Sequence, residues 1–126
     1  MQLEKVDGYE HIYAADSFFD GYSKMFGKHK KKEEARYMEK LLVNLRILDS
    51  GGHYLHMQQF EKLKSSNLYA IRHVSKMNPR VIFFYQDEDG TVLLLHSFLE
   101  KSNSDYEAAI QKASHILKEL GGNSDD

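Results

Sequence analysis

Residues 68–98, LYAIRHVSKMNPRVIFFYQDEDGTVLLLHSF, decide the fold because they hold three apolar runs separated by two turns. The runs at 68–74, 80–86 and 91–98 have the apolar, β-branched and aromatic composition of strands. The turn DEDG ends in a glycine that tolerates the positive φ of a hairpin, and Pro79 stands at a strand entrance, where it removes no ladder hydrogen bond. The stretch therefore predicts consecutive antiparallel strands.

Helical patterns flank these strands on both sides. Apolar residues recur at steps of three and four over residues 32–49, which predicts an amphipathic helix. A shorter stripe predicts a helix near residues 17–27, and the two helices are expected to form an antiparallel hairpin. A last helix is predicted at 104–120, with Ser104 and Glu107 as its capping box.

A short strand is expected at residues 9–15, whereas residues 53–66 are interpreted as a loop with one turn of helix. The predicted order is therefore β-α-α-β-β-β-α, an α+β fold. It has a small antiparallel-rich sheet of about four strands, an N-terminal helical hairpin and a C-terminal helix. The length fits one domain over residues 1–126, in which the acidic tail at 121–126 is expected to fray.

Composition argues against several classes of protein. The chain has no cysteine, which excludes disulfides and thiolate chemistry and favours the cytoplasm. No apolar run is long enough for a membrane span, and the N-terminus lacks the apolar core of a signal peptide. The seven histidines lack metal-ligand spacing, and no phosphate-binding loop or nucleophile elbow occurs, so neither a metal nor a cofactor is expected.

Charge is strongly segregated along the chain. Residues 24–46 hold eight basic and three acidic side chains, and residues 60–86 hold five and one, whereas the remainder from Asp87 is acidic. Two basic blocks in a mildly acidic chain predict a local anion-binding face. For residues 28–40, however, a solvated helix face is the favoured interpretation, since a charge run is usually exposed.

Cations at strand ends are the candidates for chemistry. When the first two strands of the quoted stretch form a hairpin, Arg72 and Arg80 come close together, with Lys76 in the turn and Lys101 beyond the third strand. The strand entrance is expected to expose Arg80. Arginine forks and lysine point charges suit a phosphate, and they stabilise the charge that builds on a scissile phosphodiester.

Each candidate also has a purely structural interpretation. Arg72 could form a surface salt bridge with Glu88 or Asp105, and the arginine of the next strand could simply solubilise its end. Tyr106 could stack on a base or be a half-buried aromatic at a helix start. His96 follows three leucines, which favours a hydrogen-bonded core residue, although histidine is also the natural acid–base group near neutrality.

The second half of the chain resembles the RelE/HigB-type toxins of bacterial toxin–antitoxin modules, within the RelE/ParE superfamily. The resemblance covers about residues 60–118 and depends on an ordered set of features. Arg72 lies in one strand, Arg80 opens an aromatic-rich strand, and LLHSF at 94–98 ends the next. Lys101 then lies in the loop before the terminal helix.

The resemblance implies a RelE-like fold and a metal-independent endoribonuclease that cuts mRNA in the ribosomal A site and so inhibits translation. In such an mRNA interferase the 2′-OH of the substrate attacks the adjacent phosphate. The implied partners are a cognate antitoxin of helix-turn-helix type, the ribosome and mRNA; DNA would be contacted only through the antitoxin, and no membrane is involved. The site residues expected in this chain are, for catalysis, Arg72, Arg80, Lys101 and His96, and for RNA binding Lys62, Lys64, Lys76 and Tyr106.

The loop before the terminal helix departs from the pattern of many relatives, because Glu100 replaces a base and a second base and a proline are absent. This loss of positive charge leaves two alternatives open. One is a ParE-like toxin that inhibits DNA gyrase without cutting nucleic acid. The other is a degenerate member that only binds its antitoxin or RNA.

Overall fold

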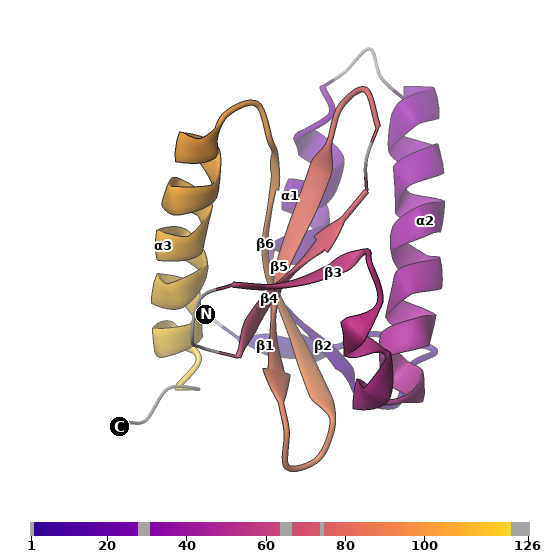
Figure 1. The fold of residues 1–126 in the computed structure, drawn as a ribbon, viewed down its shortest axis with the longest axis vertical. Helices are drawn as coiled ribbons and strands as arrows, with labels where there is room; N and C mark the ends of the chain where they lie inside the picture. Colours follow the sequence, from indigo (N-terminus) through magenta and orange to yellow (C-terminus); the bar gives the residue numbers. More distant parts are fainter. Residues whose placement is uncertain (1, 28–30, 64–66, 74, 122–126) are drawn as a thin grey trace.

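A six-stranded mixed sheet forms the centre of the computed structural model, which describes residues 2–27, 31–63, 67–73 and 75–121 (Figure 1). The strands follow the order β1-β2-β6-β5-β4-β3, and every neighbouring pair is antiparallel except β2 and β6, which are parallel. Their bounds are β1 Leu3–Lys5, β2 Ile12–Ala15, β3 Phe60–Leu63, β4 Leu68–Arg72, β5 Pro79–Gln86 and β6 Thr91–Leu99.

The predicted α+β class, the antiparallel-rich sheet and the meander β4-β5-β6 are confirmed, but the expectation of about four strands is wrong, because the sheet has six strands and one of its pairs is parallel. The two missed strands are the short edges of the sheet. All three residues of β1 are exposed, and β3 buries only its first and last residues, Phe60 and Leu63. Neither strand therefore shows the alternation that marks a half-buried strand. The predicted helical turn in this region is the 3₁₀ helix η1 (Gly52–His56).

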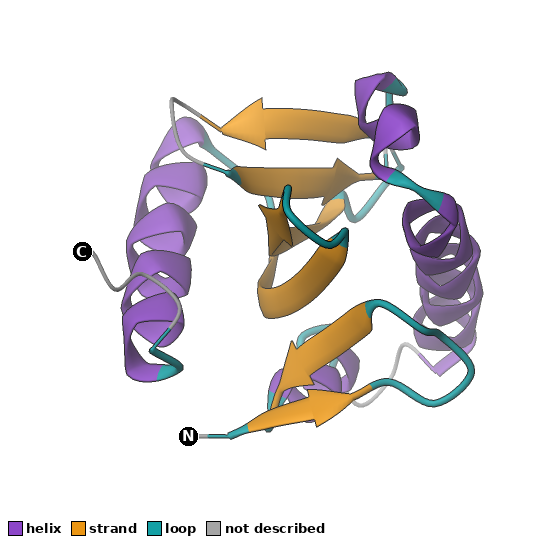
Figure 2. Ribbon diagram, turned by 90° about the horizontal axis from the view of Figure 1, so that it is seen from below, coloured by secondary structure: helices purple, strands orange, loops and turns teal. Residues whose placement is uncertain are grey.

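Three helices cover the two faces of the sheet (Figures 1 and 2). Helix α3 (Asn103–Glu119) lies on one face, and α1 (Phe18–Lys24) and α2 (Lys31–Ser50) lie on the other. Because side chains of a strand alternate between faces, each central strand contributes to both cores. The α2 side holds Val81, Phe83, Val92 and Leu94, and the α3 side holds Ala70, Ile82, Leu93 and Leu95.

The two N-terminal helices meet through aromatic side chains. The Tyr22 hydroxyl of α1 donates to the Tyr37 carbonyl of α2 at 3.2 Å, and the rings of Phe26 and Tyr37 stack with centroids 5.2 Å apart. Helix α1 otherwise packs on β6 and β2. Both predicted helices are thus present, and their shared contact is the aromatic cluster at the start of α2.

The N-terminus of α3 is capped two residues earlier than predicted. Ser102 and Asp105 form the capping box, and the Asp105 carboxylate accepts the backbone N–H groups of Lys101 and Ser102 at 2.7 and 2.9 Å. The prediction of Ser104 and Glu107 was wrong because both SNSD and SDYE place an acid three residues after a serine. In the observed register, the Asp105 carboxylate in the first turn of α3 accepts hydrogen bonds from exposed backbone N–H groups of the preceding loop.

Candidate functional site

The end of the sheet where β4 stops and β5 starts gathers most of the predicted site residues. Arg72 of β4 and Arg80 of β5 are cross-strand partners, as the hairpin prediction requires. Arg80 in turn lies opposite Phe98 of β6. Lys76 lies in the turn between β4 and β5, and Lys101 follows β6 at the same end. The topology therefore brings these four cations to one end of the sheet.

Arg80 is buried, so the expectation that the strand entrance exposes it is wrong. Only 4% of the residue is exposed, and its Nε donates to Glu100 Oε1 at 2.9 Å. Its Nη1 donates to the backbone carbonyls of His73 and Pro79 at 3.2 and 3.1 Å. These three contacts within the described part of the chain are all internal, which is the pattern of a structural buried ion pair.

Arg72 is more accessible than its neighbour. Its side chain is 40% exposed, and its Nε lies 3.7 Å from Glu61 Oε1, a separation too long for a hydrogen bond. Its acidic partner thus comes from β3, the strand that the sequence did not predict, and not from Glu88 or Asp105. A half-exposed pair at this distance contributes at most about 1 kcal/mol.

Tyr106 of α3 contacts side chains of β3 and β6 at this end of the sheet. Its hydroxyl donates to Glu61 Oε1 at 3.3 Å, and its ring packs edge-on against Phe98 with centroids 5.1 Å apart. Burial, followed by the Glu61 carboxylate, raises the pKa of the Tyr106 hydroxyl to about 12, so it remains a neutral donor at physiological pH. Two positive and two negative charges meet at this end of the sheet, on the side chains of Arg72, Arg80, Glu61 and Glu100.

The remaining lysines predicted for catalysis and RNA binding do not all lie at one place. Lys76 and Lys101 are exposed at the end of the sheet described above. Lys62 is exposed on β3, but it pairs with Tyr69 and so projects from the face opposite to Glu61. Lys64, residues 28–30 of the basic block and residues 122–126 of the predicted acidic tail lie outside the described residues.

His96 lies deeper in the sheet, on the face covered by α3. It is the cross-strand partner of Ile82, two residues along β5 from Arg80. Burial, followed by the nearby Lys112 ammonium, lowers its pKa below the usual histidine value. The structure thus places His96 partly beneath a helix, in agreement with the semi-core interpretation, while its proposed acid–base role stays a prediction.

A groove on the other face of the same sheet end was not predicted. It has a volume of about 380 Å³ and lies between α2 and the ends of β3 and β4. We call it the His73 groove; its lining residues are Glu39, Lys40, Val43, Asn44, Gln59, Arg72 and His73. Arg72 borders this groove, but its guanidinium pairs with Glu61 on the α3 side of the sheet.

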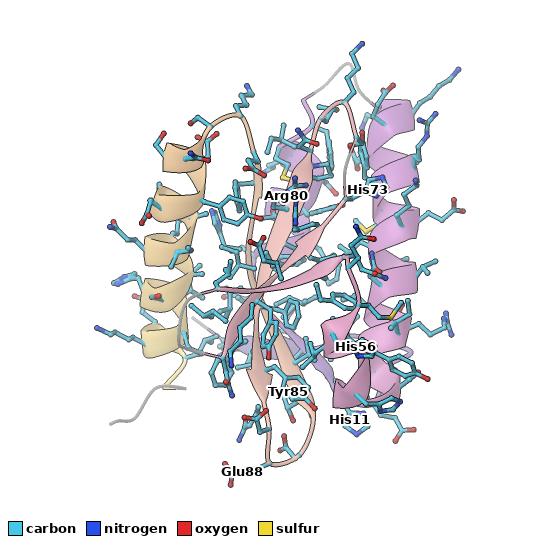
Figure 3. All side chains as sticks on the ribbon, viewed as in Figure 1. His11, His56, His73, Arg80, Tyr85 and Glu88 are labelled. Atoms are coloured by element: carbon cyan, nitrogen blue, oxygen red, sulfur yellow. The ribbon has the colours of Figure 1, made fainter. Side chains whose placement is uncertain are left out.

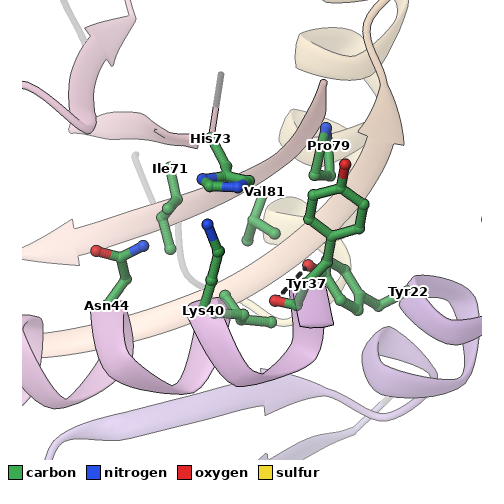
Figure 4. A pocket seen from close by; sticks show the side chains of 9 residues that line it. Tyr22, Tyr37, Lys40, Asn44, Ile71, His73, Pro79 and Val81 are labelled. Atoms are coloured by element: carbon green, nitrogen blue, oxygen red, sulfur yellow. Dashed lines mark hydrogen bonds between the residues drawn. The ribbon is translucent and has the colours of Figure 1, made fainter. Parts of the chain in front are cut away.

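His73 is held in place from several directions. Its ring lies edge-on to Tyr37 with centroids 5.4 Å apart, and its carbonyl accepts the bond from Arg80. Figure 3 shows His73 at the same sheet end as Arg80, and Figure 4 shows the Lys40 ammonium directed toward the His73 ring. Burial, followed by the positive charges of Lys40 and Arg80, lowers the pKa of His73. The neutral imidazole is therefore the main form near pH 7.

The turn that follows His73 is tied to itself and to α2. The Ser75 N–H donates to Asn78 Oδ1 at 3.1 Å, and the Asn78 N–H donates to Ser75 Oγ at 3.2 Å. The Tyr37 hydroxyl donates to the same Ser75 Oγ at 2.8 Å. Asn78 adopts φ 50°, a conformation that asparagine tolerates better than most residues. These bonds hold the turn in one position relative to α2.

Two patterns in the sequence could have indicated this groove. Lys40 and Asn44 are four residues apart on a predicted helix, so they share a face. His73 directly follows Arg72, so in a strand the two side chains flank the same edge from opposite faces. Only the tertiary structure brings that helix face to that strand end.

No group of three or more His, Asp or Glu side chains among the described residues could hold a metal ion. In the same part of the chain, no helix is long and apolar enough to cross a membrane.

Comparison with known proteins gives one family. No curated protein and no solved structure matches the chain. Residues 29–118 match the model of the family described as Phage derived protein Gp49-like (DUF891). The match does not extend to the RelE/HigB grouping, which stays a prediction. Because the match covers more than half of the sequence, the chain belongs to the Gp49-like family, a family associated with the toxins of toxin–antitoxin modules.

Proposed function

We propose that this protein is the toxin of a toxin–antitoxin module and that it inhibits translation by cutting mRNA on the ribosome. Its family is associated with such toxins, which supports the first half of the proposal. The observation that carries the second half is the set of accessible cations at one end of the sheet, Arg72, Lys76 and Lys101. A rim of cations of this kind suits the phosphodiester backbone of a nucleic acid, which is a polyanion.

The chemistry proposed for this rim needs no metal. The ribose 2′-O attacks the adjacent phosphorus, the bond from phosphorus to O5′ breaks, and the products carry a 2′,3′-cyclic phosphate and a 5′-hydroxyl. Preorganised cations stabilise the additional negative charge on the phosphoryl oxygens. Arg72 can take this role because its weak pair with Glu61 is easily replaced by a phosphate. Arg80 is a support for the strand ends, since its guanidinium is already bonded internally.

Glu61 and Glu100 favour the degenerate member as the second candidate. Each carboxylate lies against one of the two arginines expected at the site, so the four charges cancel. A protein of this kind would still bind its antitoxin or RNA but would not cut. The distinction is therefore catalytic, and a cleavage assay separates the two functions.

The test is induced expression in bacteria combined with mapping of RNA ends in a translating extract. We expect growth arrest and new 5′-hydroxyl ends within open reading frames. Arg72→Ala should reduce cleavage by at least about tenfold, as expected when a charged group that acts in the transition state is lost. Lys118→Ala removes an exposed cation near the C-terminal end of α3 and serves as the matched control.

Three outcomes would contradict the proposal. Unimpaired growth with intact transcripts, from a protein shown to be folded, would overturn the nuclease. If that folded protein still bound a small protein encoded beside it, the degenerate alternative would be supported. Inhibition of DNA supercoiling without RNA cleavage would instead favour the ParE-like gyrase inhibitor.

A further inference from the structure

We propose that the His73 groove binds the nucleotide at the cleavage position and that His73 accepts the proton of its 2′-OH. This inference rests on the proposed function and deepens it, because it assigns the reaction to a particular surface and a particular base. The groove lies on the α2 side of the sheet end, whereas the predicted Tyr106 and His96 lie on the α3 side. Arg72 borders the groove, and its guanidinium lies near Glu61 on the α3 side.

The size of the groove suits one nucleotide. Its volume of about 380 Å³ is at the lower end of the range for small-ligand sites, roughly 300–1,000 Å³. Val43 offers an apolar wall, and the amides of Asn44 and Gln59 offer donors and acceptors for a base edge. These two amides are ordered relative to each other, since Gln59 Nε2 donates to Asn44 Oδ1 at 3.1 Å.

One cation stands beside His73 in the groove. Lys40 of α2 lines both the groove and the smaller pocket behind His73, and its charge acts on the imidazole. Glu39 adds one negative charge to the lining, and the Arg72 guanidinium lies at the edge of the groove, next to Glu61. Lys40 is therefore the group placed to contact a phosphate next to the base.

His73 has the protonation state and the fixed position that a general base needs. The titratable and charged groups packed around it are Glu39, Tyr37 and Lys40 on α2, Arg72 on β4 and Arg80 on β5. Burial comes first among the causes that lower its pKa, and the Lys40 and Arg80 charges follow. A neutral imidazole accepts a proton, and a pKa below the usual histidine value keeps that form dominant near neutrality.

The buried Arg80 acquires a role in this arrangement as a positioning residue. Its guanidinium bridges the Glu100 carboxylate and the His73 carbonyl, so it connects the end of β6 to the end of β4. The edge-on Tyr37 ring then orients the imidazole over the groove. The charge at the mouth of β5 thus holds the base in place instead of contacting the phosphate.

The step is balanced within the groove and solvent. His73 takes the proton as the bond from 2′-O to phosphorus forms, and Lys40 partly neutralises the charge that accumulates on the phosphoryl oxygens. The bond to O5′ breaks, and O5′ takes a proton from solvent, to which the imidazolium then returns its own proton. No metal or redox partner takes part.

A binding experiment tests the groove without requiring turnover. The probe is a 2′-deoxy trinucleotide, which cannot be cut because it lacks the nucleophile, and the readout is the NMR spectrum of the histidine rings in the full chain. We expect the His73 signal to move on titration and its pKa to rise, because a bound anion stabilises the imidazolium. The exposed His115 on α3 should not move. An unchanged His73 signal at millimolar probe would overturn the inference.

Lys40→Ala provides a second readout that a merely structural role would not give. Removal of this cation should raise the pKa of His73 in the free protein, since Lys40 is one of the charges that lower it. The same variant should weaken binding of the probe by about tenfold, whereas Lys118→Ala should change neither quantity. An unchanged pKa in Lys40→Ala would contradict the proposed contact between the two side chains.

The cleavage experiment separates this inference from the proposed function. His73→Gln should slow RNA cleavage in a translating extract by roughly 10²–10⁴-fold. The wild-type rate should fall as pH drops below the pKa of His73, and the variant should not show this fall. His115→Gln should cleave like wild type. Equal cleavage by wild type and a folded His73→Gln would overturn the base assignment and leave the proposed function intact. Absence of cleavage by wild type would overturn both the nuclease and the base, while the ring titration still decides nucleotide binding.

Discussion

Replacement of Arg80 by methionine is expected to destabilise the fold by about 3 kcal/mol. Methionine keeps an unbranched stem of similar length but removes the guanidinium, so Glu100 loses its partner and the carbonyls of His73 and Pro79 lose their donor. Removal of one partner of a buried ion pair costs about 3–5 kcal/mol. The Glu100 side chain is 25% exposed, so water can partly solvate it, which places the expected cost at the lower end.

The assay is urea unfolding followed by circular dichroism, since the chain has eight tyrosines but no tryptophan. Glu100→Gln and the double variant complete a cycle, in which the double variant should be less destabilised than the sum of the singles by roughly 1–3 kcal/mol. Arg72→Met is the matched control, because its half-exposed pair at 3.7 Å should cost no more than about 1 kcal/mol. A midpoint for Arg80→Met equal to that of wild type would refute the reasoning. It would also mean that Arg80 variants report on chemistry and not on folding.

Two further predictions concern stability. Ser102→Ala should cost about 1 kcal/mol through loss of the α3 cap and clearly more than Ser104→Ala; equal unfolding midpoints for the two would favour the capping register predicted from sequence. Asp49→Asn should cost about 1 kcal/mol at pH 7, measured by urea unfolding, because its carboxylate accepts the N–H groups of Glu10 and His11 at 3.1 and 2.7 Å. Burial alone would raise the pKa of Asp49, but these bonds and the His11 ring lower it overall. The contribution of Asp49 to the free energy of unfolding is therefore complete above about pH 4, and it is lost as pH falls through the folded-state pKa. The difference between wild type and Asp49→Asn should therefore disappear at strongly acidic pH, whereas the exposed Asp20→Asn should show little difference at either pH.

The central strands were predictable because their apolar runs are long and bounded by clear turns. The meander β4-β5-β6 follows from those runs, and the cross-strand pairing of Arg72 with Arg80 follows from the hairpin. The edge strands β1 and β3 were not predictable, because pairing with a neighbour and not burial defines them. The parallel pairing of β2 with β6 joins segments almost eighty residues apart, and nothing local encodes it.

The sequence by itself determined the helices, the central strands and which cations collect at one end of the sheet, since these depend on short-range periodicity and strand order. Only the tertiary structure decided what those cations do. Arg80 is buried and bonded to Glu100, twenty residues away in the sequence, whereas Arg72 stays accessible beside the half-exposed Glu61 of β3. His73 became a candidate base only when α2 brought Lys40 and Tyr37 against it. Burial and local electric field set the chemistry of a side chain, and both arise from residues that are remote in the sequence.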